Sequence, residues 1–300
     1  MATKTKNNLK NNKWVPWIPD VIMAAILLVI GIIMVYPVLY EVFVSLSDSV
    51  QFVRQRGIML RPAGFSTLAY KIVLGAKPIW TGFRNTLFIE VVGLVINLTL
   101  TSFGAYFLTR KNVLWKKPVN ILIIITMYFS GGLIPTYLTV TGYGLGNSIW
   151  ALILPAAMST YNMILLRSYF STIPDSLAES VMMDGGGHFT ILFKIFIPLA
   201  KPGMMVMLLY YAVSHWNSWF SAYIYLRDVD KAPLQLVLKN MFEEESSELL
   251  KLINKYDNFD SLQETVRAAM MVVSTLPIVC LYPFLQKYFE GGIMIGSLKE

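Results

Sequence analysis

Apolar residues along this chain gather into six segments, separated by polar stretches. The hydrocarbon core of a bilayer is about 30 Å thick, so about 20 apolar residues cross it as a helix. A lone strand cannot satisfy its backbone hydrogen bonds in lipid, so each segment is predicted to be helical. The predicted spans cover residues 21–46, 86–108, 119–140, 149–169, 204–226 and 268–285, the third interrupted by Gly131, Gly132 and Pro135. The pattern therefore predicts an all-α, polytopic membrane protein with six transmembrane helices.

The composition agrees with this pattern. Of the 300 residues, 55% are hydrophobic and 14% are charged, and the mean hydropathy is +0.56. Soluble domains carry about 25% charged residues. The net charge is +7, but the basic residues cluster at the ends of the apolar spans, as membrane topology requires. We therefore expect no nucleic-acid partner. The one cysteine, Cys280, excludes an internal disulfide and a CxxC metal site.

An even number of spans places both termini on one side of the membrane. Lysine and arginine are almost equally divided between the two sides, so their totals do not decide the orientation. They are densest in the N-terminal tail and in residues 110–117, and such clusters favour the cytoplasmic side. We therefore expect both termini in the cytoplasm, with residues 1–20 as a tail and residues 21–300 as one transmembrane domain.

A polar, glycine-punctuated segment, residues 171–202, separates the fourth and fifth spans. From Pro174 to Pro202 it contains PDSLAESVMMDGGGHFTILFKIFIPLAKP. Pro174 suits the first position of a helix, where its missing N–H costs nothing. Asp175 and Glu179 then place negative charge near the positive end of that helix. A short helix is therefore predicted to start at this proline.

Three glycines, Gly185, Gly186 and Gly187, follow the predicted helix. Glycine readily takes the left-handed conformation that ends a helix. Residues 188–197 are predicted to form a second short helix, with its apolar residues toward lipid or the bundle. The segment is thus expected to be a small amphipathic structure at the membrane surface. On amphipathicity alone, a simple re-entry loop is an equally good interpretation.

Four positions in this segment reproduce the spacing E-x5-G-x9-I-x-[LI]-P, which resembles the coupling loop, or EAA motif, of permease subunits in binding-protein-dependent ABC importers. The chain departs from the family pattern at positions 180, 181 and 197, by small or conservative replacements. In that family the loop docks on a separate ATPase. The residues that the resemblance implies as ATPase-coupling residues are Glu179, Asp184, Gly185, Ile195 and Pro198.

Other stretches extend the resemblance to carbohydrate-uptake permeases. They are FSGGLIPTYL at 129–138, WALILPAAMSTYNMILLRSYF at 150–170, HWNSWFSAYIYLRD at 215–228 and KYFEGGIMIGSLKE at 287–300. The chain looks like the maltose permease subunit type with a glycine-rich C-terminal tail, in the branch that serves complex oligosaccharides. The resemblance implies a type I ABC importer permease fold, a bacterial inner or plasma membrane location, and oligosaccharide import through a central cavity by alternating access.

The same resemblance implies a heterodimer with a second permease subunit, two ATPase subunits and an extracytoplasmic sugar-binding protein. The chain contains no G-x-x-x-x-G-K-[ST] phosphate loop. ATP and Mg²⁺ are therefore expected on the partner ATPase, with no cofactor or metal on this chain. No carboxylate pair or Ser-His-Asp spacing is visible either, so a non-catalytic permease subunit is expected.

The C-terminal tail, residues 287–300, is rich in glycine. In the resembling subunits this tail reaches into the ATPase dimer interface, where a thin backbone is needed. A frayed chain end is the alternative interpretation. The tail residues implied as ATPase contacts are Gly291, Gly292, Gly296 and Ser297.

Four residues of the fifth span are candidates for lining the substrate cavity: His215, Trp216, Asn217 and Trp219. Aromatic faces stack on sugars, and amides bond their hydroxyl groups. Interhelical hydrogen bonding explains these residues equally well.

Two acidic residues, Glu41 and Glu90, lie in or near apolar spans, where a charge costs at least ~2.5 kcal/mol at the centre. Cavity lining, a proton relay and pairing within the bundle are the possible roles. Two other functions remain for such a chain, an ion-coupled secondary transporter and a membrane-embedded glycan-processing enzyme. The first usually shows matching broken helices in two halves, and the second needs an acidic or metal-ligand cluster. Neither feature is visible in the sequence.

The segment between the first two spans is strongly basic, although it is expected outside. Against the single acid Asp48 it carries Arg54, Arg56, Arg61, Lys71, Lys77 and Arg84. Long-range attraction of an acidic binding protein or a uronate-bearing oligosaccharide is one explanation. Contact with acidic residues of the partner permease or with lipid head groups is the other.

Overall fold

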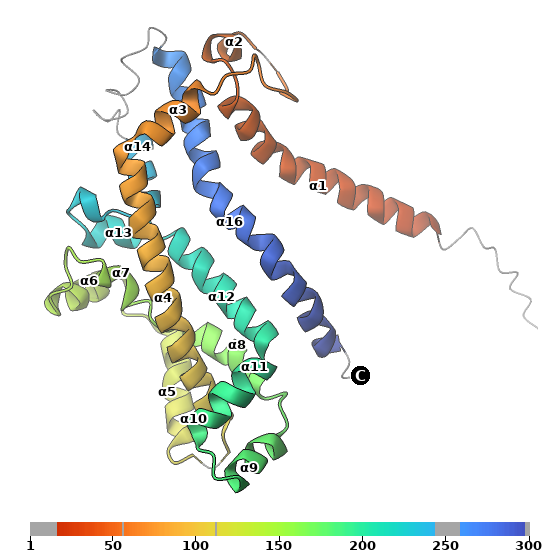
Figure 1. The fold of residues 1–300 in the computed structure, drawn as a ribbon, viewed down its shortest axis with the longest axis vertical. Helices are drawn as coiled ribbons and strands as arrows, with labels where there is room; N and C mark the ends of the chain where they lie inside the picture. The colour runs from red at the N-terminus through yellow and green to blue at the C-terminus, as the bar shows by residue number, and fades with distance from the viewer. Residues whose placement is uncertain (1–16, 56, 112, 244–258, 298–300) are drawn as a thin grey trace, which may run out of the picture.

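The computed structural model describes residues 17–55, 57–111, 113–243 and 259–297. Helices make up the regular structure of these ranges, and no strand occurs in them apart from one isolated antiparallel bridge between Ser47 and Phe65. Figure 1 shows the helices as an elongated bundle. The predicted all-α class is therefore confirmed.

Three uninterrupted helices are long and apolar enough to cross a membrane. They are α1 Trp17–Ser45, α4 Lys77–Thr109 and α16 Phe259–Ser297. They contain the first, second and sixth predicted spans, so these three predictions are confirmed. α4 begins well before the predicted start because Pro78 lies in its first turn, where a missing N–H breaks no helical hydrogen bond.

The third predicted span is sharply bent. α5 Lys116–Tyr128 and α6 Leu133–Gly142 meet at 115°. Gly132, at the break, has a φ of +84°, which favours glycine because a Cβ would be strained there. The glycines therefore break the helix rather than merely allow close packing within it.

The fourth predicted span is wrong as a continuous helix. It consists of α7 Trp150–Ile153 and α8 Thr160–Phe170, separated by a gap that contains Pro155. A proline in a helix interior removes a hydrogen bond and clashes with the preceding turn. Beyond the gap, Ser159 caps α8, because its Oγ accepts a hydrogen bond from the backbone N–H of Asn162 at 3.4 Å.

The fifth predicted span begins and ends earlier than expected. α12 covers Lys201–Trp216, and the chain leaves the helix before α13 Phe220–Tyr225. A bend of 85° joins α12 to the helical residues 188–199. In the described ranges the chain thus has three candidate spans, or up to five if each bent pair is one span, so the predicted count of six is not confirmed.

Short helices cover both ends of the long ones. At one end are α2 Ser49–Arg54, α3 Leu68–Gly75 and α14 Leu234–Glu243. At the other end are α9 Asp175–Met183, α10 His188–Ile191, η1 Leu192–Phe196 and α11 Ile197–Leu199. Figure 1 shows α2, α3 and α14 at the top, α9 and α10 at the bottom, and α4 running between them.

α4 is the central helix and packs on α8, α12 and α14. Its buried Asn97 donates a hydrogen bond to the carbonyl of Ala156 at 2.6 Å, and its Oδ1 lies 2.6 Å from Nε2 of His215 on α12. One turn away, a Cβ on Gly93 would lie only 2.7 Å from that nitrogen. The small glycine lets α12 approach closely, and the buried polar bonds fix the register of the two helices.

α1 stands apart from the rest of the bundle. It packs on α16 near its own C-terminal end, and the two helices then diverge, as Figure 1 shows. Apolar side chains along most of α1 are exposed, among them Met34 with 73% of its surface accessible. Such a helix face suits lipid or a partner subunit rather than water.

Candidate functional site

The polar segment between the fourth and fifth predicted spans forms α9, a separate short helix. Pro174 is its N-cap, with a ψ of 134°, and Asp175 is its first helical residue. The predicted position of Pro174 inside the first turn is therefore wrong by one residue. The carboxylate of Asp175 lies in the first turn, next to the positive end of the helix, as expected.

α9 ends in a Schellman motif. The N–H of Gly186 donates to the carbonyl of Val181 at 2.8 Å, and the N–H of Gly185 donates to the carbonyl of Met182 at 3.0 Å. Gly185 has a φ of +79°, the left-handed conformation predicted for it. A Cβ on Gly186 would meet Val181 at 2.5 Å, so both glycines are needed for this turn.

The second predicted helix is present but irregular. α10 passes into one turn of π-helix, η1, and then into α11, where the ring of Pro198 removes a backbone donor. Ile191 and Phe196 are fully buried in the bundle, as predicted, and Ile195 is half-buried against the same cluster. The chain then turns by 85° into α12.

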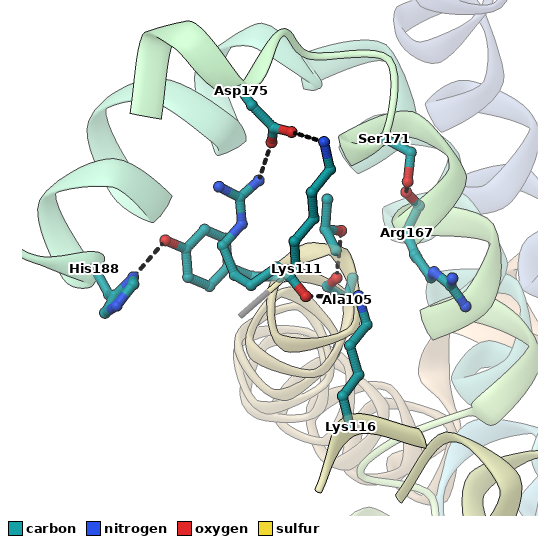
Figure 2. Close-up of polar contacts among 10 residues, drawn as sticks. Ala105, Lys111, Lys116, Arg167, Ser171, Asp175 and His188 are labelled. Carbon is teal, nitrogen blue, oxygen red and sulfur yellow. Dashed lines mark hydrogen bonds and ion pairs between the residues drawn. The ribbon is translucent and has the colours of Figure 1, made fainter. Parts of the chain in front are cut away.

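An ion pair ties α9 to the end of α4. Lys111 Nζ lies 2.7 Å from Asp175 Oδ2, and Arg110 Nη2 lies 3.5 Å from Oδ1, as Figure 2 shows. The hydrogen bond from Lys111 lowers the pKa of the Asp175 carboxyl below its ordinary value, and the same bond raises the pKa of Lys111. Asp175 therefore stays ionised at neutral pH, and the contact is lost only as the pH falls through that lowered pKa.

The same end of α4 also holds α10. The hydroxyl of Tyr106 lies 2.9 Å from Nδ1 of His188 (Figure 2). The guanidinium of Arg110 lies over the rings of Tyr106 and Phe196, at 5.1 Å and 4.6 Å from their centroids. Arg110 thus contacts α9 and η1 at once, and α9 and α10 are both connected to one long membrane helix.

Sequence reasoning missed Tyr106, Arg110 and Lys111 as part of this site. The only signal for Arg110 and Lys111 was the dense basic cluster at residues 110–117, which was interpreted through membrane topology alone, and Tyr106 had no signal. Pairing of Asp175 with this cluster depends on the packing of α4 beside α9.

The outer face of α9 is open. Leu177 is 41% exposed, Met182 44% and Met183 88%, whereas Ala178 is buried against the bundle. At 3.6 residues per turn these three side chains point in different directions around the helix, so they form no single apolar face, and Met183, the last residue of α9, is the most exposed of them.

The coupling residues suggested by the sequence do not form one cluster. Glu179, Asp184 and Gly185 are exposed on α9 and at its end. Ile195 and Pro198 lie beyond the turn, on η1 and α11, where Ile195 packs inward and Pro198 is exposed. The first three lie on the same exposed helix and turn as Met183, and Ile195 packs in the cluster beneath them.

The C-terminal tail continues α16. The helix includes Gly291, Gly292, Gly296 and Ser297, while residues 298–300 lie outside the described ranges. ATPase contact by the tail stays a prediction.

The four cavity candidates fall into two pairs. His215 and Trp216 are buried, and Trp216 Nε1 donates to the carbonyl of Ser274 at 3.0 Å. Asn217 and Trp219 are exposed, with the Asn217 amide donating to Val213 in its own helix. The buried pair connects α12 to α4 and α16, and a substrate-lining role for these four residues stays a prediction.

The two intramembrane acids have different surroundings. Glu41 lines a small cavity of about 290 Å³ together with Glu264 and Arg267. One carboxylate oxygen of Glu90 is buried and has no hydrogen-bond partner in the described part of the chain. No group of three or more metal-ligating side chains occurs in the same residues.

Comparison with known proteins places the chain in a family. No protein-family model matches it. YtcP of Bacillus subtilis (strain 168), a polygalacturonan/rhamnogalacturonan transport system permease protein, is 35% identical over 93% of this chain and 98% of that protein. Protein LplC of the same organism is 36% identical over 90% of this chain and 91% of its own length.

A solved structure agrees with these relatives. It is a bacterial ABC transporter involved in the import of the acidic polysaccharide alginate, and one of its chains superimposes with a TM-score of 0.85 and 31% identity. The match covers 96% of this chain and 100% of the other. The resemblance noted in the sequence is confirmed. The chain belongs to the carbohydrate ABC transporter permeases, the non-catalytic membrane components of binding-protein-dependent importers.

Proposed function

We propose that this chain moves uronate-bearing oligosaccharides across a bacterial cell membrane, as one permease subunit of an ATP-driven importer. The relatives named above include a polygalacturonan/rhamnogalacturonan permease and an importer of the acidic polysaccharide alginate. Arg54 and Arg61 also line a polar cavity of about 540 Å³ near α2, at the end of the bundle opposite α9. An arginine guanidinium matches the geometry of a carboxylate. Arg56 lies outside the described residues.

In this proposal the ATPase docks on α9. Met183 supplies an exposed apolar contact at the end of the helix, with Glu179 and Asp184 as exposed polar neighbours. ATP and Mg²⁺ bind to the ATPase and not to this chain. Closure of the ATPase dimer displaces α9, and the contacts of Tyr106, Arg110 and Lys111 with α9 and α10 pass the displacement to α4.

α4 carries that displacement to the other end of the bundle. It is an unbroken helix of 33 residues, packed on α8, α12 and α14. Helices that are packed in this way shift as rigid bodies between discrete arrangements. The proposed outcome is alternating access, with a central cavity that opens first to the binding protein and then to the cytoplasm.

The proposed assembly implies one orientation of the chain in the membrane. α9 and both termini face the cytoplasm, where two ATPase subunits bind. A second permease subunit completes the cavity and, with lipid, covers the exposed face of α1. The extracytoplasmic sugar-binding protein docks at the end that carries α2 and α3.

The exposed apolar end of α9 is the observation that carries the coupling proposal, and it can be tested by cross-linking. In a Cys280→Ser background, Met183→Cys should cross-link to the ATPase in the assembled importer. Trp80→Cys, 55% exposed near the opposite end, is the matched control and should not. Absence of the Met183→Cys product from a complex that contains the ATPase contradicts the docking proposal.

The substrate class needs a separate measurement. With its binding protein present, the importer should hydrolyse ATP faster when an oligogalacturonate is added, and a neutral oligosaccharide of equal length should have little effect. The reverse preference contradicts the uronate proposal and leaves the coupling proposal intact.

The C-terminal tail is proposed to reach the ATPase dimer. Deleting residues 291–300 should lower substrate-stimulated ATPase activity per assembled complex more than it lowers the amount of complex. Unchanged activity per complex would show that the tail is a frayed end.

A further inference from the structure

A second charged cavity lies beside α9, between the end of α4, the start of α5 and α8. Its volume is about 910 Å³. Four cationic and two large apolar side chains contribute to its lining: Lys111, Lys116, Lys117, Arg167, Leu114 and Trp115. Figure 2 shows Lys111, Lys116 and Arg167 in this region, on three different segments. The proposed coupling mechanism makes no use of Lys116, Lys117 or Arg167.

The positive charges of this cavity are not balanced by acids. None of its lining residues is acidic, and among the described residues Lys111 alone of these cations has an acidic partner, Asp175. Lys116 Nζ donates to a main-chain carbonyl at 2.6 Å, and Arg167 Nη1 to an asparagine amide oxygen at 3.4 Å. Both acceptors are neutral. In the described ranges no ion pair reaches Lys116, Lys117 or Arg167, so the cavity attracts anions.

Apolar side chains stand next to these cations. Leu114 is 81% exposed and Trp115 72% exposed. Trp115 has a φ of +63°, which is uncommon for a residue other than glycine. The loop joins the ends of two apolar helices, so it lies at the membrane surface, where tryptophan is enriched.

We propose that this cavity binds the phosphate of an anionic phospholipid, with Lys116, Lys117 and Arg167 around the head group and Trp115 and Leu114 at the acyl boundary. Basic pockets between membrane helices bind such head groups. The apolar side chains favour a lipid over free phosphate, because a free ion would leave them in water. The lipid proposal rests on the proposed function in one respect only: the orientation with α9 in the cytoplasm places this cavity in the cytoplasmic leaflet.

The test is lipid binding by the purified, assembled importer, without substrate or ATP. Phosphatidylglycerol and phosphatidylcholine are titrated in detergent, and bound lipid is counted by native mass spectrometry. A basic residue near an anionic surface contributes about fivefold in affinity, so Lys116→Gln with Lys117→Gln should weaken phosphatidylglycerol binding about 25-fold. Lys71→Gln with Lys77→Gln removes two exposed cations at the other end and should leave this binding unchanged.

Two further measurements distinguish a lipid head group from free phosphate as the bound anion. Inorganic phosphate at millimolar concentration should not displace the lipid, and phosphatidylcholine should bind equally to both double variants. If the Lys116/Lys117 variant does not assemble, Lys117→Gln alone should show about a fivefold loss. Equal phosphatidylglycerol binding by the unmodified and variant importers overturns the proposal. A variant that loses the second permease subunit while lipid binding is unchanged identifies the cavity as a protein interface instead.

These outcomes are independent of transport. An importer that binds phosphatidylglycerol at this cavity but moves no uronate contradicts the proposed function alone. One that transports uronates with unchanged lipid binding in the variant contradicts the lipid site alone.

Discussion

The two ends of α4 hold their neighbours by different means. Near its start, Asn85 Nδ2 donates to the carbonyls of Asp230 and Ala232 at 2.7 Å and 3.0 Å. Beside it, Thr86 Oγ1 accepts the N–H of Leu234 at 2.8 Å, in a buried position. At the far end α9 is joined to α4 by the Asp175 carboxylate, which pairs with Lys111, whose side chain is 81% exposed, and with Arg110, whose side chain is 11% exposed.

Burial explains what each end can do. A buried hydrogen bond has no water to replace it, so breaking one partner leaves an unsatisfied group and costs about 1–3 kcal/mol. An exposed ion pair exchanges readily with water and salt, and contributes little to stability. The α14 end is therefore fixed on α4 by buried hydrogen bonds, whereas the polar contact between α9 and α4 is partly open to water and can rearrange at a smaller cost.

The largest effect is expected at the end of α9. Gly185→Val places a β-branched residue at a φ of +79°, and left-handed backbone costs about 1–2 kcal/mol for an L-residue. At about tenfold per 1.4 kcal/mol, this cost should weaken docking about 5- to 30-fold, and uptake should fall accordingly. Substrate-stimulated ATPase activity and uptake by the assembled complex are the measurements.

Gly187→Val is the matched control. Gly187 has a φ of −88°, and neither glycine has an atom within 4 Å of an added Cβ. The two variants therefore differ in backbone strain and not in crowding. Equal activity in both would show that the turn at Gly185 does not serve coupling.

At the α14 end of α4, we expect a substitution to lower the thermal stability of the complex. Thr86→Val keeps the shape of the side chain but leaves the buried N–H of Leu234 unpaired, at a cost of about 1–3 kcal/mol. Thr81→Val, on the same helix, removes only a bond to the carbonyl of Lys77 within that helix. Thermal unfolding of the complex in detergent should show a lower midpoint for the first variant alone. A larger loss for Thr81→Val would contradict the comparison.

The long helices could be predicted from apolar length alone. α1, α4 and α16 follow directly from it. The breaks within the other predicted spans could not be predicted in this way, because glycine and proline are tolerated in membrane helices when neighbours satisfy the freed backbone groups. Whether Pro155 or Gly132 bends, breaks or simply lies within a helix depends on packing partners that one sequence does not identify.

The candidate site was likewise predicted only in part. The end of α9 at Gly185 is local chemistry, so the glycine run revealed it. The contact that holds the start of α9 was missed, because Asp175 and its partner Arg110 are 65 positions apart in the sequence. A basic cluster next to a span has an immediate topological explanation, and only the folded chain shows that it also holds a carboxylate.

A smaller effect is expected from the ion pair itself. Asp175→Asn and Lys111→Gln should each lower uptake a few-fold with little loss of stability, and the double variant should be no worse than Asp175→Asn alone, because that substitution already removes the partner of Lys111. Additive losses would show that the residues act separately. Because the pKa of Asp175 is lowered, the contribution of this pair to uptake should stay constant from about pH 5 to pH 8.

The smallest effect should come from the charges at the fixed end. Arg54 and Arg61 line an exposed polar cavity, so they act on an approaching acidic oligosaccharide or binding protein mainly through long-range attraction. Arg54→Gln with Arg61→Gln should slow uronate uptake a few-fold at low ionic strength. The deficit should shrink as salt rises toward ~1 M, where screening acts over ~3 Å. Docking of the binding protein on the importer without substrate is the control, and it should weaken in this variant only if the attracted species is the binding protein. A deficit that is independent of salt would place these arginines in direct contact with a partner subunit, and would make the outer end a docking surface rather than a source of attraction.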